Sequence, residues 1–292
     1  MAKNIIFILT EGDHDAAFIY RILRTNGMMP KHNIAIKDYP SPLNELMKSQ
    51  ISLVPIDELN MEIARSKFLP SYIMQKDDNI ISIYRVGGVS KETVRVNFIK
   101  EINFWNSSDQ DAIQVLKDTH IGILFFFDAD KQGIDKRIEQ IKKELKLSFP
   151  EDEAKNIDKL INKEIFPVGN IYTGGFIFGE HGKQFGILED ILIPLMKKDN
   201  DDIFSAAENF LDIHETTTLF KGKIEYDGER KKKVNGKKYA HKKSLIGTVG
   251  QLQISGKSNI VCISDADYLT DDKIKNNPAC IDIYSFIQKT LK

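Results

Sequence analysis

Cysteine is scarce in this sequence, and long hydrophobic runs are missing. The two cysteines, Cys262 and Cys280, are too few for a disulfide framework and lack the spacing of a metal site, so we expect a reducing, cytoplasmic setting. The apolar run at residues 4–9 is short and is soon followed by Glu11. That run predicts neither a signal peptide nor a membrane span, and we expect no membrane association.

Net charge is also nearly absent, because 41 Lys and Arg residues balance 42 Asp and Glu residues. A global basic field that would attract nucleic acid is therefore excluded. A nucleic-acid partner would have to contact a local basic patch or bind through a metal ion. The 292 residues are ample for a buried core, and they allow one large domain or a core with an extension.

Short apolar runs alternate with amphipathic segments through much of the chain. Residues 4–9, 80–86 and 121–127 are typical of buried strands, and the last run, apolar on both faces, predicts a central strand. Helices are predicted in three segments, at residues 16–24, 90–105 and 134–145. Strands that alternate with helices favour an α/β fold with a mainly parallel sheet flanked by helices.

Composition divides the chain into a core and an extension. Prolines interrupt residues 40–79, for which we expect an irregular, partly helical insertion into a core of residues 1–199. Residues 200–292 predict a mostly helical C-terminal extension. Within it, the segment 221–243 is rich in lysine, polar and hairpin-like.

Acidic side chains directly follow two of the predicted strands. Glu11 lies just past the first strand, and Asp128 and Asp130 lie just past the central one. Loops at the carboxyl ends of strands form the ligand crevice of open α/β sheets, so these acids can converge in space. Two aspartates one residue apart on an extended segment point the same way and can share a Mg²⁺ ion. Two such ions can stabilise the attacking and leaving oxygens of a phosphodiester.

Ordinary turn and capping chemistry is the alternative for each of these acids. An Asp-x-Asp pair after a strand often only caps the next helix. Glu189 and Asp190 lie in a first helical turn, where the dipole favours acids anyway. For a second such pair, Asp265 and Asp267, we favour an ordinary structural role over a metal site, because strand and helix cannot be separated for so short a run. His14 lies beside Glu11 and could reach the site, but we favour a capping or solvent-facing role for it. The recurrence of a buried strand that runs into an acid makes the combination more specific than any one motif.

Three further groupings of residues carry a resemblance to a known family. They are Ile-Leu-Thr-Glu-Gly-Asp-His-Asp at 8–15, Phe-Phe-Phe-Asp-Ala-Asp at 125–130 and Gly-Ile-Leu-Glu-Asp-Ile-Leu at 186–192. In this order they resemble the Toprim domain of topoisomerases, bacterial primases, RecR-like proteins and OLD-family nucleases. The last motif, with the basic segment His241-Lys242-Lys243-Ser244, is similar to standalone OLD-like Toprim families, which include effectors of phage defence.

The resemblance implies a metal-dependent site. It implies that Glu11 is a metal ligand or general acid/base, with further ligands at Asp15, Asp128, Asp130, Glu189 and Asp190. A lysine, either Lys242 or Lys243, would stabilise developing phosphate charge. The implied cofactor is Mg²⁺ or Mn²⁺, with two ions bound.

The chain also departs from that family. The insertion at 40–79 separates Glu11 from Asp128 by more than a minimal Toprim domain needs. The sequence has neither a primase zinc cluster nor a P-loop, so an ATPase partner would be a separate chain. A homo-oligomer is compatible with the resemblance.

The lysine-rich segment offers a surface for phosphate contacts. The functional interpretation is an arm beside the metal site that binds nucleic acid through Arg230, Lys231, Lys232, Lys233, Lys237 and Lys238. A charge run is more often a solvated loop, and this alternative is favoured.

Three functions compete for this sequence. The first is a metal-dependent nuclease that cleaves phosphodiester bonds of DNA or RNA, to which the resemblance adds, by analogy, a role as a phage-defence effector with a separate ATPase. The second is a non-catalytic, RecR-like module that binds nucleic acid or protein. The third is a small-molecule phosphotransfer enzyme, which would turn over nucleotides without affinity for a polymer.

Overall fold

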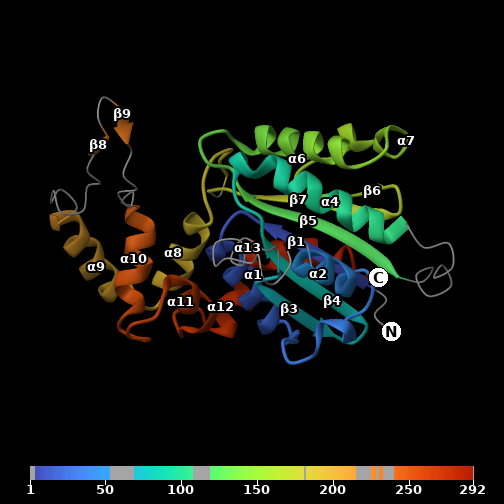
Figure 1. Cartoon of the computed structure of the whole chain (residues 1–292). Helices are drawn as coiled ribbons and strands as arrows, with labels where there is room; N and C mark the ends of the chain where they lie inside the picture. The colour runs from blue at the N-terminus through green and yellow to red at the C-terminus, as the bar shows by residue number, and fades with distance from the viewer. Residues whose placement is uncertain are drawn as a thin grey trace.

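Seven strands form one sheet in the computed structural model, with helices on both of its faces (Figure 1). The structure describes residues 4–52, 69–107, 119–180, 182–214, 225–227, 230–232 and 240–291. The strand order is β2-β3-β4-β1-β5-β7-β6. In that order the strands span Met29–Pro30, Tyr72–Lys76, Asn79–Arg85, Asn4–Thr10, His120–Asp128, Ile171–Phe178 and Ile165–Val168.

The centre of the sheet is parallel. β1 pairs in parallel with β4 and with β5, and β5 pairs in parallel with β7. The pairs β2–β3, β3–β4 and β6–β7 at the two edges are antiparallel. Leu9 is in register with Tyr84 and Phe125, so the carboxyl ends of the three central strands reach the same edge. The predicted α/β class, with a mainly parallel sheet flanked by helices, is confirmed.

Side chains of β1 alternate between two hydrophobic cores. Ile6 and Ile8 belong to one core, whereas Ile5, Phe7 and Leu9 belong to the other. All seven residues of the strand are buried. A strand covered on both faces needs apolar side chains throughout, which explains the uninterrupted run in the sequence.

Helices cover each face of the sheet. α1 (Asp13–Thr25) and α8 (Glu189–Lys197) pack into the core on one face. α2 (Leu43–Ser52), α4 (Glu92–Ser107) and α6 (Ile134–Ser148) pack into the core on the other. Shorter helical turns are α7 (Glu151–Ala154) and the 3₁₀ segments Ile36–Asp38, Val89–Lys91 and Ile157–Lys159. Because α1 directly follows β1 and α6 directly follows β5, each acidic motif lies between a strand and a helix.

The expected insertion at residues 40–79 needs a correction. Its first part is helical, as α2, but Tyr72–Lys76 forms strand β3, which pairs with β4. Asp77 and Asp78 connect the two strands, and Asp77 has a φ of 51°. Such two-residue hairpins usually carry Gly or Asn, so the Asp-Asp pair did not predict a turn. The part of the expected insertion at residues 53–68 lies outside the described ranges.

The C-terminal residues are mostly helical, as predicted. They form α9 (Asp201–His214), α10 (His241–Gly250), α11 (Asn259–Asp265), α12 (Asp271–Asn276) and α13 (Pro278–Gln288). Phe286 of α13 packs against both Phe126 and Phe176 of the sheet, with ring centroids 5.7 Å apart in each case. Residues on both sides of the expected boundary at 199 therefore contribute to one core.

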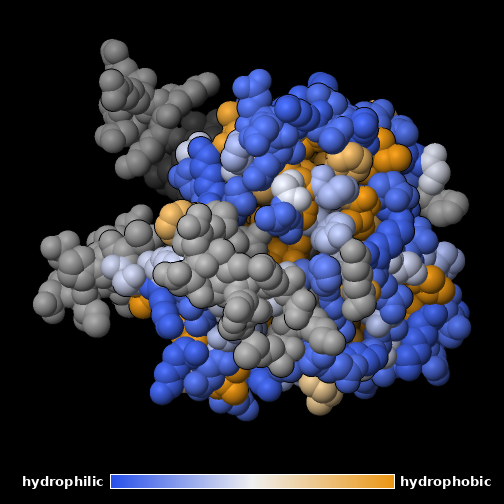
Figure 2. Space-filling view, turned by 90° about the vertical axis from the view of Figure 1, so that its right-hand side faces the viewer, coloured by the Kyte–Doolittle hydropathy of each residue, from blue (hydrophilic) through white to orange (hydrophobic). Residues whose placement is uncertain are grey.

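The lysine-rich segment contains a short antiparallel pair, β8 (Glu225–Asp227) with β9 (Arg230–Lys232), which confirms a hairpin in the part that is described. Within the described ranges, every helix is too short or too polar to cross a bilayer. Figure 2 views the side of the molecule on which the N-terminus lies in Figure 1. On that face the described residues are mostly hydrophilic, with hydrophobic ones scattered between them.

Candidate active site

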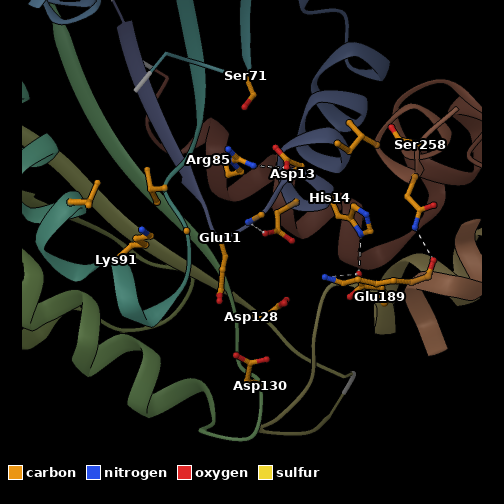
Figure 3. Close-up of a pocket in the computed structure, with 18 of the residues that line it drawn as sticks. Glu11, Asp13, His14, Ser71, Arg85, Lys91, Asp128, Asp130, Glu189 and Ser258 are labelled. Atoms are coloured by element: carbon orange, nitrogen blue, oxygen red, sulfur yellow. Dashed lines mark hydrogen bonds and ion pairs between the residues drawn. The ribbon is translucent and has the colours of Figure 1, made fainter. Parts of the chain in front are cut away.

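A pocket of about 1260 Å³ opens beyond the carboxyl ends of β1 and β5. Acidic side chains gather in it, from the loop after β1, from α1, from the end of β5 and from α8 (Figure 3). The predicted acids that line it are Glu11, Asp15, Asp128, Asp130 and Glu189. The sequence-distant acids therefore converge at the edge where open α/β sheets hold their ligands.

Glu11 points from the end of β1 toward Asp128 and Asp130 (Figure 3). Its Oε2 accepts a hydrogen bond from Nη2 of Arg137 at 2.9 Å. A Cβ at position 88 would lie 2.5 Å from Oε1 of Glu11, so a larger residue there would require the carboxylate to move from its present position. The Gly87-Gly88 turn thus shapes the pocket as well as ending β4.

Asp128 and Asp130 are held differently at the end of β5. Oδ1 of Asp128 accepts a hydrogen bond from the backbone N–H of Leu188 at 2.7 Å. Asp130 has a φ of 49°, and its backbone N–H donates to the carbonyl of Gly186 at 2.8 Å. The left-handed conformation is one that Asp tolerates better than most residues do. Both aspartates are thereby tied to the loop that precedes α8.

Arg137 joins two of the predicted acids although no motif marks it in the sequence. Its Nη2 donates to Oε2 of Glu11 and to Oδ2 of Asp130, each at 2.9 Å. The two carboxylate oxygens are therefore separated by at most twice that distance. A signal for this residue does exist, because Arg137 lies three residues after Ile134 and four before Ile141, on the apolar stripe of α6. A charged side chain on such a stripe must be paired when it is buried.

Asp15 and Asp128, unlike Glu11 and Asp130, have no cationic side chain paired with them among the described residues. Burial raises the pKa of Asp15 well above its usual value, and the nearby charge of Asp128 adds to the effect. Burial likewise raises the pKa of Asp128 to about 7, against the lowering effect of the Leu188 N–H, with further contributions from neighbouring carboxylates. Neither side chain forms an ion pair with any Lys, Arg or His for which the structure gives a position. Negative charge is therefore most poorly balanced on this side of the pocket.

Glu189 has cationic neighbours. Its Oε1 lies 3.1 Å from Nδ1 of His14 and 3.8 Å from Nζ of Lys243. Burial alone would raise the pKa of Glu189, but the hydrogen bond from His14 and the charge of Lys243 outweigh it, so the pKa is lowered. His14 therefore pairs with a pocket acid, which corrects the expected capping or solvent-facing role.

Asp190 and Lys242 pair with each other at the side of the pocket. One carboxylate oxygen of Asp190 contacts Nζ of Lys242, and the other accepts from the backbone N–H of Ile187 at 2.9 Å. Neither residue lines the pocket, whereas Lys243 does. The structure thus separates the two lysines that the sequence left equivalent and leaves Asp190 outside the acidic cluster.

Basic side chains also line the pocket. Arg85 pairs with Asp13 at 2.9 Å, and Lys91 and Lys243 line the same opening. The predicted contacts of the lysine-rich segment stay predictions. Only the backbone of Arg230, Lys231 and Lys232 is described, and Lys233, Lys237 and Lys238 lie outside the described ranges.

The second Asp-x-Asp pair has a structural role at Asp265. This residue ends α11, and its Oδ1 accepts from Nη1 of Arg24 on α1 at 2.8 Å. Nearby, Nη1 of Arg21 donates to the carbonyl of Ser264 at 2.7 Å. These contacts fasten α1 to α11, and Asp265 and Asp267 do not line the pocket. The ion pair of Asp265 with Arg24 is the kind of ordinary structural role that we favoured for this pair.

The chemistry of the pocket suits a hard divalent cation. Carboxylate oxygens are the ligands that Mg²⁺ and Mn²⁺ prefer. The buried Asp15 and the neighbouring Asp128 supply such oxygens without a described counter-charge. Among the positioned residues, no three His, Cys, Asp or Glu side chains form a group that could hold a metal ion as they stand.

The raised pKa of Asp128 predicts a pH-dependent stability. Between 3.8 and about 7, the folded protein keeps a proton on Asp128 that the unfolded chain has released, so the free energy of unfolding falls as pH rises through this window. The Asp128→Asn variant lacks this loss. In EDTA we expect similar melting temperatures near pH 4, and a wild-type melting temperature that falls below that of the variant by about 10 °C in total as pH rises to about 7. Thermal unfolding followed by circular dichroism measures these melting temperatures. A wild-type melting temperature that rises relative to that of the variant as pH increases would contradict the prediction.

Comparison with known proteins gives a family for the chain but no activity. A family described as "Protein of unknown function (DUF3226)" matches residues 6–277. No curated protein matches the sequence. Among solved structures, the chain is similar to the hypothetical protein PH0156 from Pyrococcus horikoshii OT3, with 14% sequence identity and a TM-score of 0.49. That similarity covers 98% of this chain and 95% of the other.

Proposed function

The chain belongs to the DUF3226 family, and from its pocket we propose that it is a Toprim-like nuclease that uses Mg²⁺ or Mn²⁺ to cleave phosphodiester bonds of DNA or RNA. One observation carries the proposal: carboxylates from three regions far apart in sequence, residues 11–15, 128–130 and 189, line a single pocket at the carboxyl edge of a mainly parallel sheet. Capping alone does not require acids so distant in sequence to converge.

Asp15, Asp128 and Glu189 are the residues best suited to hold a divalent cation. When bound there, Mg²⁺ would neutralise negative charge that develops on phosphate oxygens. Binding requires these carboxylates to turn toward a common ion, whose charge would also offset the burial and the repulsion that raise the pKa values of Asp15 and Asp128.

The remaining pocket residues would bind and orient the substrate. Lys243 is half exposed at the pocket wall, with its Nζ 3.8 Å from Glu189, so it can turn toward a phosphate. Arg85 and Lys91 line the same opening and can contact neighbouring phosphates. Arg137 would keep the Glu11 and Asp130 carboxylates in place. A separate ATPase chain as partner in phage defence stays a proposal by analogy.

The test is cleavage by the purified wild-type chain. Labelled single- and double-stranded DNA and RNA are incubated with Mg²⁺, Mn²⁺ or EDTA, and we expect cleavage with either metal and none with EDTA. Binding of the polymer without cleavage would instead support a RecR-like module. Turnover of nucleotides without affinity for a polymer would support small-molecule phosphotransfer.

The two adjacent lysines provide a matched pair of variants for the same assay. We expect Lys243→Ala to reduce the cleavage rate by on the order of 10²-fold, because removal of one charge-stabilising donor has effects of this size. Lys242→Ala should cost much less, since its ammonium group is engaged with Asp190 outside the pocket. Equal losses in the two variants would count against a role for Lys243 at the phosphate.

A further inference from the structure

Arg137 is a buried cation inside the acidic pocket. Its side chain is 1% exposed, whereas the Glu11 and Asp130 side chains with which it pairs are 23% and 44% exposed. A single guanidinium nitrogen, Nη2, contacts both carboxylates at 2.9 Å. A cation is therefore already fixed between the two acids that follow β1 and β5.

Other contacts hold the guanidinium in this position. Nε of Arg137 donates to the backbone carbonyl of Asp128 at 2.7 Å, and Nη1 donates to Oε1 of Gln140 at 3.1 Å. The guanidinium carbon lies 6.0 Å from the centre of the Phe127 ring. Moving the side chain away would break these contacts and leave a buried charge to be solvated or paired elsewhere, which is unfavourable.

The pocket thus has two unequal halves. Glu11 and Asp130 share the positive charge of Arg137, while Asp15 and Asp128 have no cationic partner among the residues that the structure positions. A divalent ion between Glu11 and Asp130 would meet the fixed guanidinium at short range, and like charges repel strongly in a buried setting. An ion near Asp15 and Asp128 would instead meet two carboxyl groups that have no described cation beside them.

We propose that Arg137 takes the place of one metal ion, so that the pocket binds a single divalent cation on the side of Asp15 and Asp128. This inference rests on the proposed metal-dependent function but deepens it, because it replaces the expected two ions by one ion and an arginine. Arg137 is a positioning residue in this scheme: it fixes Glu11 and Asp130 and excludes a second ion from between them.

The experiment counts bound Mn²⁺ by electron paramagnetic resonance during a titration of the full chain, without substrate. We expect one Mn²⁺ per wild-type chain and two per Arg137→Gln chain. Arg95→Gln is the matched control, because Arg95 is equally buried and also lies over the Phe127 ring but pairs with Glu144 instead of a pocket acid. It should bind one Mn²⁺. Circular dichroism selects a temperature at which all three proteins are folded.

Milder variants keep the test decisive if Arg137→Gln does not fold. Asp130→Asn preserves the left-handed backbone, which Asn also tolerates, and should change the Mn²⁺ affinity little. Asp128→Asn should weaken it on the order of 10–100-fold. Two Mn²⁺ per wild-type chain, or equal losses of affinity in these two variants, would overturn the role of Arg137 while leaving a metal-dependent nuclease intact. Wild-type protein that binds no Mn²⁺ would overturn both proposals.

Discussion

Asp128→Asn is expected to reduce metal-dependent cleavage by on the order of 10²–10³-fold, the loss typical when a preorganised electrostatic contact at the reacting group is removed. Asn is nearly the same size as Asp, and its side-chain oxygen can still accept the hydrogen bond from the Leu188 N–H. The fold should therefore persist while one negative charge beside the metal is lost. Initial cleavage rates at saturating Mg²⁺ measure the effect.

Asp267→Asn is the matched control for this variant. Asp267 also belongs to an Asp-x-Asp pair, but it is exposed and lies outside the pocket lining. Its rate should equal that of the wild type. If Asp128→Asn cleaves as fast as Asp267→Asn does, the acidic pocket is not the site of cleavage.

Arg95→Leu is expected to lower the free energy of unfolding by about 3–5 kcal/mol, because it leaves one charge of a buried ion pair without its partner. Arg95 and Glu144 have side chains 1% and 0% exposed, and they are joined by two hydrogen bonds of 2.8 and 2.5 Å. Arg95 also donates to the carbonyls of Gly87 and Gly88 beside Glu11. Denaturant unfolding followed by fluorescence or circular dichroism measures the loss.

The double variant Arg95→Leu/Glu144→Leu separates lost pairing from lost packing. With both charges removed, no unpaired ion stays buried, and we expect most of the stability to return, since buried ion pairs often exchange for apolar residues at little net cost. A double variant no more stable than Arg95→Leu would show that the loss comes from the contacts of Arg95 with the Gly87 and Gly88 carbonyls and from its packing, and not from an unpaired Glu144.

The central architecture could be predicted because its signals are local. β1 and β5 are continuous apolar runs that end in acids, and a strand buried on both faces leaves few alternatives for such a run. Their parallel pairing then places Glu11 and Asp128 at one edge. The meeting of these acids therefore follows from strand direction alone.

Strand β3, which lies between β4 and the edge strand β2, could not be predicted in the same way. Tyr72–Lys76 is short, follows a proline-rich stretch, and enters its hairpin through two aspartates instead of a glycine-containing turn. Its strand conformation depends on pairing with β4, which is a tertiary contact.

The burial of three charged side chains was also not predicted from the sequence. Arg95, Arg137 and Glu144 read as surface residues by type, but each lies on the apolar stripe of its helix, for example Arg95 three and four residues before Phe98 and Ile99. The choice between Lys242 and Lys243 likewise depends on how α10 is rotated against α8 and α9, which a helical period does not fix without knowledge of its neighbours.

The wall of the pocket that comes from Lys243 and Asn259 has a practical consequence for anyone who wishes to dissect the protein. A fragment that stops at residue 199 would lack that wall. It would also lack the residues of α11 that accept hydrogen bonds from Arg21 and Arg24, and Phe286, which packs against Phe126 of the sheet. The chain is thus a poor candidate for trimming to residues 1–199, because its late segments form part of the pocket wall and of the core beneath it.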